Sequence, residues 1–173
     1  MKKVIVSMLA VIYCAVLFCS CFAESDYDPR SEGYFMIGST DETALAFADD
    51  FAEGNVGLYQ QFGVKTALYI FDTMEGADIT DDLMESLLSI HEAIVGDTSD
   101  DMVILIVLDK NDYRFWFGEN VKEKCSDDAL QEVLDAVKAE DNDTIFAEVA
   151  KAYVGVSYRM LGWSIGNSAS SDN

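Results

Sequence analysis

The sequence predicts a small α/β domain: a three-layer sandwich in which a βαβ unit carries one antiparallel hairpin strand, with helices on both faces of the sheet. Three observations indicate this fold. Hydrophobic residues switch repeatedly between helical and strand spacing along the chain. The continuous apolar run Met102–Leu108 is typical of a strand that is covered on both faces. The turn Asp109–Asp112 then leads into a return strand, Tyr113–Phe117.

The first half of the domain is expected to contain a helix, a strand and a second helix. Ser39 and Glu42 have the spacing of a capping box, and apolar residues within 44–52 repeat on one helical face after them. Val64–Phe71 is rich in β-branched and aromatic residues and therefore predicts a strand. A second helix is expected to begin at Thr80, because two aspartates follow it in the first turn.

The second half adds the hairpin and two amphipathic helices. One helix follows a cap at Ser126 and carries an apolar stripe through Val137, and the other carries apolar residues from Ile145 to Met160. A right-handed βαβ crossover makes the strands Val64–Phe71 and Met102–Leu108 parallel. The expected order of elements is therefore α-β-α-β-β-α-α.

The N-terminal segment predicts export. Lys2 and Lys3 precede an apolar stretch from Val4 to Ser20, which suits a signal peptide and is short for a membrane span of about 20 residues. We therefore expect a signal peptide over 1–23, a tether over 24–38, an α/β domain over 39–165 and a flexible tail over 166–173. The folded part is expected outside the cytoplasm, either secreted or anchored to the outer face of the membrane.

Three interpretations of the processing site stay open. Cys21-Phe22-Ala23 offers small residues for ordinary signal cleavage before Glu24. Alternatively, 17–21 resembles a lipobox, which would place a lipid on Cys21 after cleavage before that residue. A diacylated anchor would hold the domain stably at a membrane. The third interpretation is an uncleaved anchor.

The charge excludes whole classes of partner. All 32 acidic residues follow the signal segment, which holds two of the 11 basic residues, so the charge after it is 9 − 32 = −23. Nucleic-acid binding needs clusters of Lys and Arg, which this sequence lacks. Docking on anionic headgroups is excluded on the same ground, so membrane contact is expected only through the N-terminal segment or a lipid. We expect a protein partner at the cell envelope.

Two residue types that often carry chemistry occur here in isolation. Cys125 is the one cysteine after the signal segment, and His91 is the one histidine of the chain. His91 lies on the apolar stripe of the second predicted helix, so we expect a histidine in the core or at its edge that is hydrogen-bonded to the backbone. We likewise expect Cys125 to be a partly buried structural residue.

A candidate metal site follows from the strand ends. Open α/β sheets bind ligands beyond the carboxyl ends of their parallel strands. Asp72 follows the first predicted strand, Asp109 follows the second, and Asp112 lies in the adjoining turn. Their oxygen atoms suit Ca²⁺ or Mg²⁺ as a cofactor. The alternative is that these residues serve only to make turns.

The same three aspartates would be the ligands of a divalent-metal-dependent phosphatase. Phosphoryl transfer also needs cationic stabilisation of the phosphoryl oxygens. Lys110 and Arg114 are the nearby cations, and the sequence shows no glycine-rich phosphate loop and no Ser-His-Asp arrangement. We therefore favour a non-catalytic protein and keep the phosphatase as the alternative, with its catalytic residues unknown.

Several phrases of the chain resemble the TPM domain family of exported or lumenal α/β modules. They are Tyr59–Val64, Asp100-Asp101 before the apolar run, Tyr113–Gly118 and Ser126-Asp127, within a match over Thr40–Leu161. The resemblance implies an exported, often membrane-tethered domain. Family members have been linked with assembly or repair of membrane protein complexes, some have been proposed as acid phosphatases, and some bind calcium or another divalent ion. The chain differs from common members in lacking a second transmembrane segment and a glycine-rich tail.

Taken together, these expectations describe an exported, acidic, TPM-like domain that acts as a binding or assembly module of the cell envelope.

Overall fold

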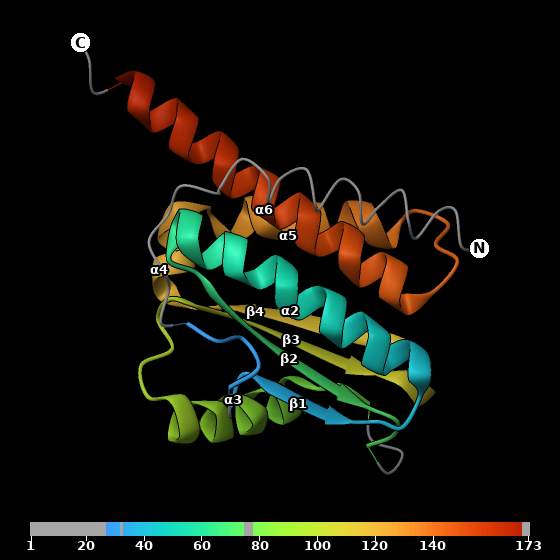
Figure 1. Cartoon of the computed structure of the whole chain (residues 1–173). Coiled ribbons are helices and arrows are strands. Elements are labelled where there is room, and N and C mark those ends of the chain that lie inside the picture. The colour runs from blue at the N-terminus through green and yellow to red at the C-terminus, as the bar shows by residue number, and fades with distance from the viewer. Residues whose placement is uncertain (1–26, 32, 75–77, 171–173) are drawn as a thin grey trace.

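The computed structural model describes residues 27–31, 33–74 and 78–170, with side chains through Gly162. Its elements form a layer of strands between two layers of helices (Figure 1). In chain order they are β1 (Phe35–Gly38), α2 (Glu42–Phe62), β2 (Lys65–Phe71), α3 (Asp81–Val95), β3 (Asp101–Val107), a 3-10 turn (Leu108–Lys110), β4 (Asp112–Phe117), α4 (Glu119–Lys124), α5 (Asp127–Lys138) and α6 (Ile145–Ser170). The predicted signal segment and Cys21 lie outside the described residues.

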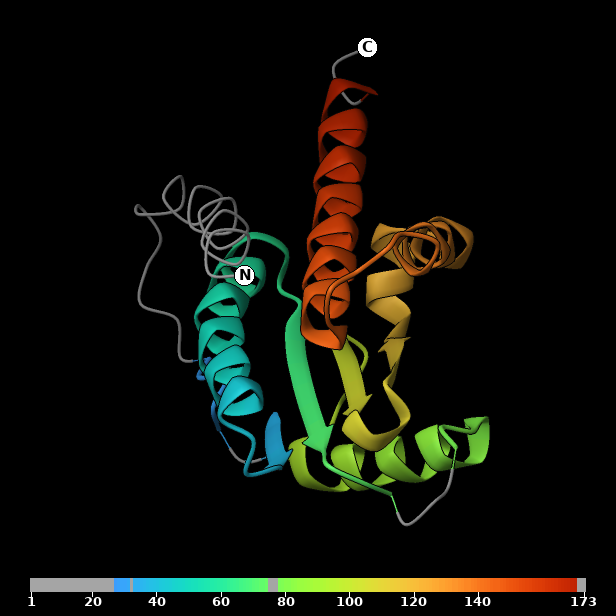
Figure 2. The same cartoon turned by 90° about the vertical axis from the view of Figure 1, so that its right-hand side faces the viewer.

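The sheet has the order β1-β2-β3-β4. The first three strands are parallel, and β4 is antiparallel to β3. Helices α2, α5 and α6 cover one face of this sheet, and α3 covers the other (Figures 1 and 2). The predicted α/β sandwich, with its βαβ unit and antiparallel hairpin strand, is therefore confirmed. None of the described helices is long and apolar enough to cross a membrane.

The range 24–38, predicted as a tether, contains the edge strand β1. Its four residues are too few to show a strand period, and pairing with β2, for example Phe35 with Leu68, defines it as a strand. The chain before it is also folded, since the Tyr27 hydroxyl lies 3.1 Å from Thr66 N and 3.2 Å from Thr66 O. The folded unit therefore extends upstream of residue 39.

The ends of two helices also differ from the expectation. Asp41, and not Ser39, caps α2: its Oδ1 accepts hydrogen bonds from the amides of Thr43 at 2.7 Å and Ala44 at 3.2 Å. The main chain of α6 continues through Ser170, past the expected start of the tail at residue 166.

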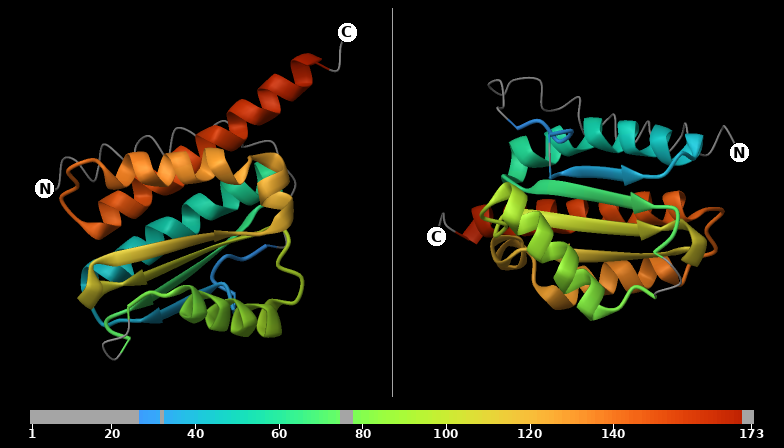
Figure 3. Two further views of the ribbon diagram at one scale, coloured as in Figure 1. Left: turned by 180° about the vertical axis from the view of Figure 1, so that it is seen from behind. Right: turned by 90° about the horizontal axis from the view of Figure 1, so that it is seen from below.

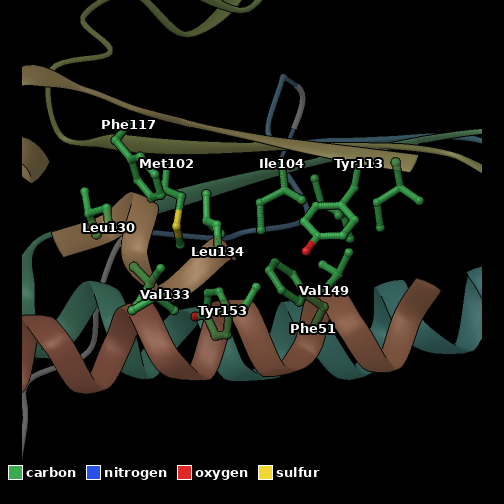
Figure 4. Packing of buried hydrophobic residues seen from close by; sticks show 14 of the residues in the cluster. Phe51, Met102, Ile104, Tyr113, Phe117, Leu130, Val133, Leu134, Val149 and Tyr153 are labelled. Carbon is green, nitrogen blue, oxygen red and sulfur yellow. The ribbon is translucent and has the colours of Figure 1, made fainter. Parts of the chain in front are cut away.

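The position of β3 at the centre of the fold explains its apolar sequence. All seven of its residues are buried, because both faces are covered. On one face, Ile104 and neighbouring sheet residues point toward Phe51 and Val149 of the helices (Figure 4). On the other face, Leu105 packs in a smaller core with Tyr69 and with residues of α3.

The main chain at position 118 lies so close to the loop before β3 that only glycine fits there. A methyl group there would lie 2.4 Å from the main-chain oxygens of both Thr98 and Ser99. The approach is fixed because the Gly118 amide donates to Asp101 O at 2.8 Å. Gly118 thus fastens the end of β4 to the loop that enters β3.

We predict that Gly118→Ala lowers the free energy of unfolding by about 1–3 kcal/mol, the usual cost of forcing extra atoms into packed structure. The matched control is Gly162→Ala in α6, where the added methyl meets nothing within 4 Å. The control should be neutral or stabilising by about 0.5–1 kcal/mol. Urea unfolding of both variants measures the difference, and equal stabilities would contradict the packing at Gly118.

Candidate functional site

The structure brings two of the three predicted metal ligands to one edge of the sheet. The Asp109 amide donates to Asp72 O at 2.9 Å, so the two residues lie side by side at the carboxyl ends of β2 and β3. Both are exposed. Thr73 Oγ1 donates to Asp109 Oδ2 at 2.7 Å and takes up one carboxylate oxygen.

Asp112 serves a different purpose. Its carboxylate lies 4.0 Å from Arg114 Nη2 and 3.8 Å from Lys138 Nζ. Asn111 adopts a left-handed backbone with φ of 47°, as a hairpin turn requires. In the part of the chain that the structure describes, no three Asp, Glu, His or Cys side chains are arranged to hold a metal ion. The structure thus supports a turn-forming role for Asn111 and an ion-pairing role for Asp112, and the Ca²⁺ or Mg²⁺ site stays a prediction.

The most ordered polar cluster is elsewhere, between α3 and the sheet. His91 Nε2 lies 2.9 Å from Asp101 Oδ2, and both side chains are fully buried. His91 Nδ1 lies 2.9 Å from Gly33 O and 2.8 Å from the Tyr69 hydroxyl, which itself donates to Gly33 O at 2.6 Å. The Tyr34 hydroxyl completes the cluster at 3.5 Å from the Asp101 carboxylate.

The two ring nitrogens of His91 face two different oxygen atoms: Nε2 faces Asp101 Oδ2, and Nδ1 faces the carbonyl oxygen of Gly33. The polar contacts of the Asp101 side chain are made by Oδ2, and its buried Oδ1 has no hydrogen-bond partner in the part of the chain that the structure describes. His91 is therefore buried and bonded to the backbone, as expected, but its carboxylate partner was not foreseen.

This cluster is closed to substrates. His91, Tyr69 and Asp101 each have no exposed surface. It resembles the histidine–carboxylate pair of many catalytic sites, but a catalytic base must reach the proton that it removes. We therefore assign the cluster a structural role.

Cys125 is equally unsuited to catalysis. Its side chain is buried in the core beneath α2, α5 and α6, whereas His91 lies under α3 on the opposite face. Burial raises the pKa of the Cys125 thiol, and the charge of Arg159 lowers it by less. The thiol is thus kept in its unreactive protonated form.

A groove of about 440 Å³ lies beside Cys125, lined by residues of α4, α5 and α6 that include Lys122, Tyr158 and Arg159. Its cations already have partners: Lys122 Nζ lies 3.2 Å from Asp127 Oδ2, and Arg159 Nη2 lies 2.8 Å from Glu132 Oε2. The groove therefore offers an anion little uncompensated positive charge.

Exposed apolar side chains gather at a different place. Among the described side chains, five large hydrophobic residues are exposed: Met36 at 38%, Leu45 at 44%, Ile90 at 53%, Ile94 at 44% and Tyr158 at 57%. The first four, which we call the β1 rim, come from β1, α2 and α3.

Two contacts place the helical parts of the β1 rim beside the chain that enters β1. Arg30 Nη2 donates at 3.2 Å to the carbonyl of Asp49, one helical turn after Leu45. A methyl group at Gly33 would lie 2.7 Å from Ile94 Cγ2. From below, α3 crosses the sheet obliquely, and its C-terminal end lies over the N-terminal ends of the parallel strands (Figure 3). The β1 rim is thus an apolar border around one sheet edge. Single exposed apolar residues scattered over a surface are ordinary, whereas several at one edge indicate an interaction surface.

We predict strong coupling between His91 and Asp101. His91→Gln removes the imidazole that contacts the buried carboxyl group of Asp101 and should cost about 3–5 kcal/mol of unfolding free energy. The double variant with Asp101→Asn should lose at least about 1 kcal/mol less than the sum of the two single variants. Urea unfolding of the four proteins gives the coupling. The control cycle is the exposed pair Lys151–Glu140, which has a similar distance of 2.8 Å and should couple by less than about 1 kcal/mol. Equal coupling in the two cycles would contradict this role.

Stability is also expected to fall at alkaline pH. Burial, followed by the nearby charge of Asp101, raises the pKa of Tyr69 to about 12, whereas a tyrosine in an unfolded chain titrates near pH 10. The pKa of Tyr69 is higher in the folded state than in the unfolded state. Its contribution to the free energy of unfolding is therefore complete below pH 10 and is lost as the pH rises toward 12, at up to about 1.4 kcal/mol per pH unit. Urea unfolding between pH 9 and pH 11 should show a smaller slope for Tyr69→Phe than for the unaltered protein. An unchanged slope would show that Tyr69 ionises freely.

Comparison with known proteins supports the fold. No family model matches the chain, and no curated protein matches it. The structure is similar to the solution NMR structure of the N-terminal domain of a protein from P. gingivalis, with a TM-score of 0.58 over 74% of this chain and 80% of that one. The two sequences are 13% identical, so the likeness concerns the fold alone. The chain therefore shares an α/β architecture with that domain, and its function has to be argued from its own surface.

Proposed function

We propose that this chain is an exported module of the cell envelope that binds a protein partner, as the resemblance to TPM domains implies. Its N-terminal segment, or a lipid on Cys21, would hold it at the outer face of the membrane. The observation that carries the proposal is the β1 rim, where four of the five exposed large hydrophobic side chains border one edge of the sheet. Apolar residues gathered in this way are typical of an interaction surface.

The described chemistry favours binding over catalysis. The histidine–aspartate pair and the cysteine are enclosed in separate cores on opposite faces of the sheet. The exposed carboxylates Asp72 and Asp109 have each other's main chain and Thr73 as neighbours. A phosphatase would need an accessible nucleophile or a bound metal together with free cations. The β1 rim, by contrast, is accessible in the structure as it stands.

Acidic side chains next to the apolar residues would supply a polar border to the interface. Asp49 is 78% exposed, lies one turn from Leu45 on α2 and has Arg30 Nη2 at 3.7 Å, while Glu53 lies one turn further along the same flank of the helix. Interfaces commonly combine an apolar centre with a polar border, and charge complementarity guides the partner into position. The partner is accordingly expected to present apolar side chains together with positive charge.

We predict that a photo-crosslinking amino acid at position 90 or 45 forms adducts with one protein of the envelope in intact cells. The same amino acid at position 158 is the matched control, because Tyr158 is equally exposed but borders the groove between α5 and α6. A second variant, Ile90→Asp with Ile94→Asp, should reduce the adducts from position 45 at least tenfold. This variant should change the free energy of unfolding by less than about 0.5 kcal/mol, since both side chains are exposed. Equal adducts at positions 90 and 158, or none at either rim position, would overturn the proposal.

A further inference from the structure

The outer edge of β1 presents main-chain groups for another strand. Tyr34 O accepts from the Leu68 amide at 2.7 Å, so Tyr34, Met36 and Gly38 direct their polar groups toward β2. Alternate residues of a strand point these groups in opposite directions. The amides and carbonyls of Phe35 and Ile37 therefore point outward, and they have no hydrogen-bond partner within the described part of the chain.

The edge strand β1 is protected by its short length of four residues. Sheet edges are otherwise commonly blocked by lysine, proline, a bulge or inward-pointing charges. The sequence of β1, Phe-Met-Ile-Gly, contains none of these residues. The opposite edge strand, β4, carries both Asp112 and Arg114.

The two sides of the edge differ in chemistry. Met36 pairs with Tyr69, whose side chain lies in the core under α3, so Met36 faces the same side as Ile90 and Ile94. The α2 side has Leu45 and the exposed carboxylate of Asp49. Successive side chains of an added strand would point to these two sides alternately.

The charge on the α2 side selects the occupant. Three exposed acidic residues, Glu42, Asp49 and Glu53, lie on the flank of α2 that bears Leu45. Arg30 Nη2 lies 3.7 Å from Asp49 Oδ1 and compensates one of these charges. A lysine or arginine of the partner would compensate the others, with its aliphatic part lying over Leu45. A second copy of this chain would instead bring another net charge of −21 to the same edge.

We propose that β1 receives an extended segment of the partner as a fifth strand, with apolar side chains toward Met36, Ile90 and Ile94 and basic side chains toward α2. Strand addition of this kind derives affinity from main-chain hydrogen bonds and specificity from alternate side chains. The inference rests on the proposed protein-binding function and specifies the partner's conformation and charge.

The test uses the full chain in mild detergent and two short synthetic peptides, one alternating valine with lysine and the other valine with glutamate. The valine–lysine peptide should slow hydrogen exchange of the Phe35 and Ile37 amides at least tenfold and bind at least tenfold more tightly than its acidic counterpart. Ile37→Pro removes the outward amide and should weaken binding at least tenfold. Ile37→Ala, which loses the side chain but keeps the amide, should weaken it less than threefold.

A second variant keeps the test decisive if Ile37→Pro does not fold. Asp49→Lys with Glu53→Lys should abolish the preference for the basic peptide while leaving the fold intact, because both residues are exposed. Binding that leaves the exchange of the Phe35 and Ile37 amides unchanged would overturn strand addition. Slowed exchange of these amides in the chain alone, rising with its concentration, would identify a second copy as the occupant and would also overturn the inference.

These outcomes separate the inference from the proposed function. If adducts form in cells at position 90 but neither peptide protects the β1 amides, the partner binds the β1 rim without adding a strand. If the basic peptide protects these amides but no adduct forms in cells, strand addition is supported and the envelope function fails.

Discussion

The arrangement of this domain depends on a polar side chain that is buried at the start of its central strand. Asp101 is the first residue of β3 and has no exposed surface. An isolated carboxylate in such a position would cost several kcal/mol, so α3 must bring His91 to it. The second ring nitrogen of His91 reaches Gly33 O at 2.9 Å, two residues before β1 begins. The contacts of one histidine thereby set the relative positions of β3, α3 and the chain that enters β1.

The same pair influences what the surface exposes. A helix that turns His91 toward the sheet places its neighbour Ile90 about 100° around the axis, and Ile94 lies one turn further on the same flank. Both isoleucines are therefore left at the border of α3 and not beneath it, at exposures of 53% and 44%. The apolar surface beside β1 is thus a consequence of the polar core behind it.

Local patterns were sufficient to predict most of the fold. Periodicity identified α3, β3 and β4, and the crossover rule gave the parallel and antiparallel pairings. The rule on strand ends also brought Asp72 and Asp109 together correctly. What escaped prediction depends on distant contacts. β1 is defined by its pairing with β2, the Asp101–His91 pair joins two elements, and Asp112 pairs with Lys138 of α5. Each of these contacts joins two different elements of the fold, so the local sequence pattern around either residue does not predict it.

The bonds to the Gly33 carbonyl also have a mechanical consequence. The chain reaches β1 through residues that follow the proposed anchor, so tension between a membrane and the domain would act first on this stretch. At Gly33 the load would pass to Tyr69 on β2 and His91 on α3 through bonds of 2.6 and 2.9 Å. Because these bonds would carry the load, β1 would stay paired with β2. The edge strand would thus keep its shape while the domain is pulled away from its tether.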